Sequence, residues 1–197
     1  IDPDHDTHIR GEGFTVTPED VQRQRDVLSE LIEPGAAVCI CGSLPPGLDT
    51  AMLMQLIDHV ESLSGRVVLD SNGPHMAAIA ERGVAIAKPN ALELRQMSGR
   101  DGSLRDMAAP LMNRFETLLV SDGANGAGVM TGGRAVWGRL PLEPNEVRNT
   151  VGCGDSLLAG YLAGKMRGER TEDALRQALA CAAANAIAGT TAGFTGD

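Results

Sequence analysis

Residues 149–158 read NTVGCGDSLL, so two glycines flank Cys153 and an aspartate follows at once. The apolar run after Asp155 continues with small residues to Gly164, which predicts a helix beginning at this loop. The first N–H groups of a helix have no intrahelical partner, and the helix dipole favours an anion there. Glycines let several amides converge on one point. The pattern predicts an anion site with the Asp155 carboxylate beside it.

Two other interpretations fit the same residues. A dinucleotide-binding loop needs a buried strand immediately before its glycines, but residues 144–149 (PNEVRN) are polar, so we exclude it. An ordinary loop that ends in a capping aspartate and starts a buried helix explains the motif equally well. On this motif alone the choice between an anion site and a capped helix stays open.

Composition limits the classes of partner. The chain has 197 residues, which is enough for one domain with a full core. Its net charge of −9 and its 3% aromatic content argue against nucleic acid and against an anionic membrane surface. No apolar run reaches the roughly 18 residues of a membrane span. An anionic substrate must therefore be held by backbone amides, a few Lys or Arg side chains and a divalent cation.

The order of apolar patterns predicts an α/β fold with three layers, in which helices cover both faces of a mostly parallel sheet. A helix starts at Thr17-Pro18, and Gly132-Gly133 predicts a hairpin turn. Strands are expected at 36–41, 66–70, 84–88, 117–121, 127–131 and 134–140, and helices between them at 50–63, 74–82, 90–97 and 104–115.

The continuous apolar run at 36–41 predicts a strand that is buried on both faces. Cys39 and Cys41 lie two residues apart and should share one of these faces. The four cysteines of the chain form no CxxC pair, so we expect buried free thiols in a cytoplasmic protein.

Polar or glycine-rich loops follow four of the predicted parallel strands, at 42–47, 70–74, 88–93 and 121–126. In open parallel sheets, ligands bind beyond the carboxyl ends of the strands. We therefore expect these loops to meet along one edge of the sheet, where the loop at Gly152–Asp155 joins them.

Five motifs in this order carry a resemblance to a known family: CGSLPPG at 41–47, VLD at 68–70, KPNALE at 88–93, VSDGANGA at 120–127 and NTVGCGDS at 149–156. The chain resembles the carboxy-terminal two-thirds of a pfkB-type carbohydrate kinase of the ribokinase-like superfamily, over nearly all of residues 1–197. Much of that family has Asp where this chain has Asn149. Together with Gly-Ser-Leu-Pro-Pro-Gly, the asparagine resembles the phosphosugar-kinase branch.

The resemblance implies a role for each residue of the glycine loop. Asp155 would be the base that deprotonates the attacking sugar hydroxyl, and the amides of Gly152, Cys153 and Gly154 would form an anion hole for the transferred phosphoryl group. Ser43 would lie near the sugar phosphate, although its proline-rich motif also explains a stiff turn.

The same resemblance implies the nucleotide and metal sites. ATP would be bound by Ser121, Gly123, Gly126, Lys88 and Asn185, with Asn185 bordering the adenine. Asn90 and Glu93 would organise Mg²⁺ through water, which suits a cation that dehydrates reluctantly. The alternatives are a surface lysine at Lys88 and a capped helix with Glu93 in its first turn.

The expected reaction is ATP- and Mg²⁺-dependent phosphorylation of a ketohexose phosphate, with fructose 1-phosphate giving fructose 1,6-bisphosphate. Tagatose 6-phosphate and fructose 6-phosphate are the alternative substrates, and a truncated, non-catalytic nucleotide-binding homologue is the alternative of another class. The resemblance also implies that residues 1–16 are the tail of a β lid, that 17–197 form the nucleotide-binding and catalytic domain, and that the lid mediates a homodimer. The amino-terminal sugar-binding and lid portion of the family has no counterpart in this fragment.

Overall fold

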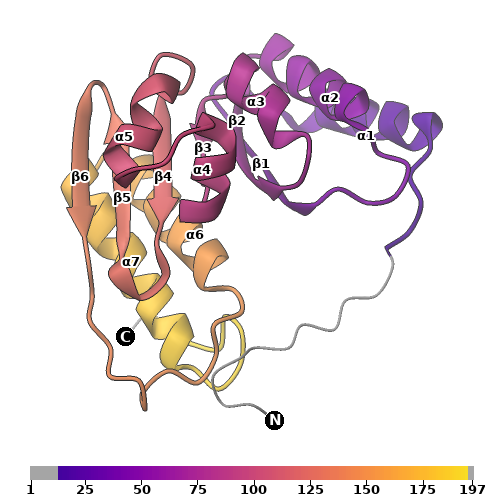
Figure 1. The fold of residues 1–197 in the computed structure, drawn as a ribbon. Helices are drawn as coiled ribbons and strands as arrows, with labels where there is room; N and C mark the ends of the chain where they lie inside the picture. Colours follow the sequence, from indigo (N-terminus) through magenta and orange to yellow (C-terminus); the bar gives the residue numbers. More distant parts are fainter. Residues whose placement is uncertain (1–12, 195–197) are drawn as a thin grey trace.

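The computed structural model describes residues 13–194, so most of the predicted lid tail lies outside the described residues. The described chain forms three layers, with helices on both faces of a six-stranded sheet (Figure 1). The strand order follows the sequence, β1-β2-β3-β4-β5-β6. Strands β1 to β4 are parallel, and β5 and β6 are antiparallel to their neighbours. The predicted fold class is confirmed.

The elements follow the predicted alternation. The strands are β1 Ala37–Ser43, β2 Arg66–Asn72, β3 Ile86–Ala87, β4 Thr117–Ser121, β5 Ala127–Thr131 and β6 Arg134–Gly138. The helices are α1 Pro18–Leu31, α2 Thr50–Ser62, α3 Met76–Arg82, α4 Ala91–Ser98, α5 Leu104–Ala108, α6 Cys153–Met166 and α7 Thr171–Ile187, with short 3-10 turns at Ala109–Leu111 and Gly123–Asn125. No helix within residues 13–194 is both long and apolar enough to span a membrane.

Alternating side chains of the central strands build two cores. On β2, Val67 and Leu69 pack with α2 to α5, whereas Val68 packs on the opposite face with α6 and α7. On β4, Leu118 and Leu119 divide in the same way. Each face of the central sheet is therefore covered, and the carboxyl ends of its strands remain open at one edge.

Strand β1 corrects the prediction of a strand buried on both faces. Cys39 and Cys41 do share a face, but both are exposed, whereas Val38 and Ile40 pack into the core below α2. The reason is position: β1 is an edge strand, and α7 contacts β5 and β6 at the far side of the sheet (Figure 1). An apolar run shows that a strand is hydrophobic, but it does not show which faces of that strand are covered by helices.

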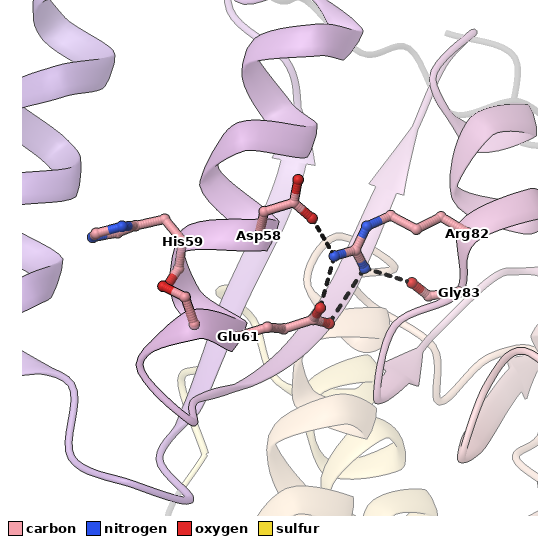
Figure 2. A network of polar contacts seen from close by, with 6 residues as sticks. Asp58, His59, Glu61, Arg82 and Gly83 are labelled. Atoms are coloured by element: carbon pink, nitrogen blue, oxygen red, sulfur yellow. Dashed lines mark hydrogen bonds and ion pairs between the residues drawn. The ribbon is translucent and has the colours of Figure 1, made fainter.

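Polar contacts fix the ends of the helices. Thr17 caps α1 as predicted, in a capping box with Asp20. Further along the chain, Arg82 at the end of α3 reaches back to α2, where its Nη2 atom lies 2.5 Å from Asp58 Oδ1 and 2.7 Å from Glu61 Oε2 (Figure 2). Its Nη1 atom donates to the carbonyl of Gly83. This network joins the carboxyl ends of two adjacent helices on one face of the sheet.

Candidate active site

The glycine loop turns into α6 through Gly152, whose φ of +84° is a left-handed conformation that favours glycine. A Cβ atom at this position would lie 2.4 Å from Cγ2 of Thr191, so a larger residue would also collide. The turn presents the first N–H groups of a 14-residue helix, which have no partners within the helix. Asp155 lies in this first turn and is exposed. The loop thus places the Asp155 carboxylate beside the first amides of α6, where the sequence predicts an anion site.

Lys88 reaches the same site from the end of β3. Its side chain is only 6% exposed, and its Nζ atom lies 3.1 Å from Asp70 Oδ2. A Cβ atom built on Gly154 would lie 3.1 Å from that ammonium nitrogen. Lys88 is therefore not a surface lysine: its charge borders the helix terminus that the glycines form.

The carboxylates interact electrostatically at this edge. Burial raises the pKa of Asp70, the nearby Lys88 ammonium opposes that rise, and Asp155 adds to it. Although Cys41 lies on the exposed face of β1, its thiol is partly desolvated, and this effect first, then Asp70, Cys39 and Asp155, raises its pKa to about 11. The end of β2 and the start of α6 therefore each bring a carboxylate, Asp70 and Asp155, into the electrostatic surroundings of this edge of the sheet, and the Lys88 ammonium pairs with Asp70.

A cavity of about 370 Å³ adjoins the glycine loop. Ser121, Gly123 and Gly126 line it on one side, and Cys153 and Gly154 line it on the other. This volume lies within the range of small-molecule sites. The structure thus brings the predicted nucleotide loop and the predicted anion hole to one cavity. The rest of the lining is mostly apolar: Ala124, Ala127, Arg139, Leu140, Leu142, Val147, Thr150, Leu157, Leu179, Ala182, Ala183 and Ala186.

Asn90 and Glu93 form a capping box at the start of α4. The Asn90 side chain accepts from the Glu93 amide at 2.9 Å, and Glu93 Oε2 accepts from the Asn90 amide at 2.8 Å. A parallel bridge joins Asn90 to Ser121, so this motif abuts the nucleotide loop. The capped-helix interpretation is therefore observed, and the metal role stays a prediction.

Mg²⁺ fits these residues only as a hydrated ion. Within residues 13–194, no cluster of three or more His, Cys, Asp or Glu side chains could hold a metal. Mg²⁺ in kinases commonly keeps several waters and binds substrate phosphates with one or two protein oxygens. The capping bond uses Oε2 of Glu93, and a carboxylate has a second oxygen with which to hold such a water.

Seven of the predicted site residues are not part of the cavity lining: Ser43, Lys88, Asn90, Glu93, Gly152, Asp155 and Asn185. Ser43 is exposed at the end of β1 and donates a hydrogen bond to Asn72 Oδ1 at 3.4 Å. Asn185, on α7, is fully buried and directs its side chain at the glycine loop, although Ala186 next to it lines the cavity. The position of Asn185 next to the adenine stays a prediction.

No sequence pattern singled out Arg139 or assigned a role to Asp70. Arg139 follows β6 and is one of the residues that line the cavity. In the sequence it is a basic residue just after a predicted hairpin, and such a position does not indicate any particular function. Asp70 ended a predicted strand within a family motif, but its pairing with Lys88 needed two separate strands to be placed side by side.

The three-layer architecture, with its sheet of four parallel strands and a hairpin, is the ribokinase-like α/β fold. The chain belongs to the pfkB family of carbohydrate kinases, whose family model matches residues 9–192. It is 33% identical over 170 residues to a 1-phosphofructokinase from Rhodobacter capsulatus, covering 82% of this chain and 53% of the relative. It is 29% identical over 162 residues to one from Bacillus subtilis, covering 80% and 52%.

Solved structures agree with this placement. Phosphofructokinase-2 from Escherichia coli, crystallised with substrates and products, superimposes with a TM-score of 0.82 at 27% identity, over 92% of this chain and 60% of that one. Ribokinase from Arabidopsis thaliana shares the fold with a TM-score of 0.65 at 18% identity, over 90% and 55%. The chain spans about half the length of the curated relatives it matches.

Proposed function

We propose that this protein transfers the γ-phosphoryl group of ATP to a hydroxyl of a ketohexose phosphate. The observation that carries the proposal is the position of Lys88 Nζ, which lies against Gly154 in the helix turn that also holds Asp155. A base, an amide-lined anion site and a buried cation at one point are what phosphoryl transfer needs, because it depends on positioning and charge neutralisation.

In this mechanism Asp155 accepts the proton of the attacking hydroxyl. The amides of the glycine loop and the Lys88 ammonium stabilise the charge on the transferred group. The cavity beside Ser121–Gly126 holds the nucleotide, whose base packs against the small apolar side chains of α7. Mg²⁺, held through water near Asn90 and Glu93, would neutralise charge on the ATP phosphates.

Fructose 1-phosphate is the proposed acceptor, because the 1-phosphofructokinases are matched over four-fifths of this chain. Fructose 6-phosphate is supported by the phosphofructokinase-2 structures, one of which is a complex with that sugar. Self-association belongs to the same proposal, since one phosphofructokinase-2 structure is described as a tetrameric inhibited form.

A non-catalytic nucleotide-binding homologue is the candidate of another class. The test is ADP formation from Mg²⁺-ATP with fructose 1-phosphate, fructose 6-phosphate, tagatose 6-phosphate or ribose. A strong preference for fructose 1-phosphate supports the proposal. ATP binding without sugar-dependent ADP formation supports the non-catalytic alternative.

A further inference from the structure

Asn185 is a polar side chain with no exposed surface, in the last turn of α7. Burying an amide is unfavourable unless its hydrogen bonds are made. Its Oδ1 atom accepts from the Ala192 amide at 2.7 Å, and its Nδ2 atom donates to Val151 O at 2.8 Å and to Cys153 Sγ at 3.3 Å. Both of its donor bonds therefore end on the glycine loop, on the two sides of Gly152.

The same turn of α7 also binds the backbone of residues 148 and 149, which lead into the glycine loop. The carbonyl of Ala186 accepts from the amides of Arg148 at 2.8 Å and Asn149 at 3.1 Å. Val151 O receives further donors from Asn149 Nδ2 at 3.1 Å and from Thr191 Oγ1 at 3.3 Å. The curvature of the anion site is thus fixed from α7 and from the segment after it.

This turn also belongs to the nucleotide cavity. Ala182, Ala183 and Ala186 line the cavity, whereas Asn185 on the same turn is directed at the glycine loop. A ligand packed on these alanines therefore rests on the element that shapes the anion site. The anion site and the nucleotide cavity are therefore both bordered by the last turn of α7.

We propose that Asn185 is a positioning residue, which holds Val151–Gly154 in the curvature that makes it an anion site and joins that site to the nucleotide cavity. This inference rests on the proposed kinase function. It assigns Asn185 no contact with the base or with the transferred group. Its effect is on the rate of transfer, through the placement of the loop amides, more than on the affinity for ATP.

The test uses Asn185→Asp, which keeps the acceptor for the Ala192 amide and removes both N–H donors to the loop. Loss of one oxyanion-hole donor typically lowers kcat by about 100-fold or more, so displaced amides should lower kcat by at least roughly 30-fold. The KM for Mg²⁺-ATP should change by less than about threefold, because the alanines of the cavity remain. The matched control is Leu175→Ala, a buried residue of the same helix that packs on the sheet.

Hydrogen–deuterium exchange provides a readout that does not need turnover. Peptides covering 148–156 should exchange at least about tenfold faster in Asn185→Asp, and as in the wild type in Leu175→Ala, while peptides of β1 and α2 stay unchanged in Asn185→Asp. Exchange and kcat that match the Leu175→Ala control would overturn the proposal. If the wild type transfers no phosphate to any sugar, the proposed function fails, and exchange of 148–156 alone decides the role of Asn185.

Discussion

Lys88 Nζ lies 3.1 Å from Asp70 Oδ2, and both side chains are shielded from solvent, with 6% and 16% exposed. The ammonium group also borders Gly154 in the first turn of α6. The protein therefore keeps a cation at the proposed anion site by neutralising it with a carboxylate from the neighbouring strand. An isolated charge at this depth would be costly, so the pair explains how the site stays stable before an anion binds.

Replacing Lys88 tests separately its contribution to activity and its contribution to stability. We expect Lys88→Met to lower kcat/KM for ATP by about 100-fold, because a buried cation at the transferred group is lost. It should also lower the free energy of unfolding by about 3 kcal/mol, because Asp70 is left without its partner. Urea denaturation and steady-state kinetics measure the two effects. The double variant Lys88→Met/Asp70→Asn should regain stability but not activity, and recovery of activity would contradict the role of Lys88.

Gly152→Ala tests the shape of the glycine loop. The new Cβ would lie 2.4 Å from Thr191 Cγ2, so the loop must move, and we expect kcat to fall by about 100-fold in a protein that still folds. Gly168→Ala is the matched control, since its φ of +75° is similar and its surroundings are open. It should cost about 1 kcal/mol of stability and leave kcat unchanged. Equal kinetic effects of the two substitutions would show that the loop's shape is not critical.

Arg139 should contribute to nucleotide affinity, because it is a basic residue in the cavity lining of a protein with net charge −9. We expect Arg139→Gln to raise the Kd for ATP by about fivefold to tenfold, which is about 1 kcal/mol, and to leave kcat unchanged. Isothermal titration calorimetry measures the change. Arg134→Gln on β6 removes the same charge from an exposed ion pair with Glu172 and should have no effect. Equal weakening by both would mean that only the overall charge matters.

The buried side chain of His75 should make the stability of the protein depend on pH. Its side chain is buried, it hydrogen-bonds Ser71 Oγ at 2.9 Å, and burial lowers its pKa from the ordinary 6.5. Below that value the unfolded chain binds the proton more readily, so the stability that neutral His75 contributes is present above pH 6.5 and is lost as the pH falls further. The free energy of unfolding should therefore drop less between pH 7.5 and 5.5 in His75→Gln than in the wild type. Urea denaturation at the two pH values measures this drop. An equal drop in His75→Gln and the wild type would exclude His75 as a source of the pH dependence.

Local sequence rules predicted the parts of this molecule that local physics fixes. Thr17 caps a helix whatever lies around it, and Gly132-Gly133 turns a hairpin. The convergence of the loops could be predicted because parallel strands end at one edge. Burial of β1 could not, since Cys39 and Cys41 face a side of the sheet that α6 and α7 do not cover. The hydrogen bonds of Asn185 to the glycine loop could not be predicted either, because Val151 and Cys153 lie 34 and 32 residues away in the sequence.

Asp155→Asn tests the central claim most directly. Sugar-dependent ADP formation from Mg²⁺-ATP should fall by at least about 1,000-fold, because the base is removed, while ATP binds as in the wild type, because the loop amides and Lys88 remain. The measurement compares kcat by a coupled assay and Kd by calorimetry in the two proteins, with fructose 1-phosphate as acceptor. Retained turnover with Asp155→Asn would contradict the assignment of Asp155 as the base.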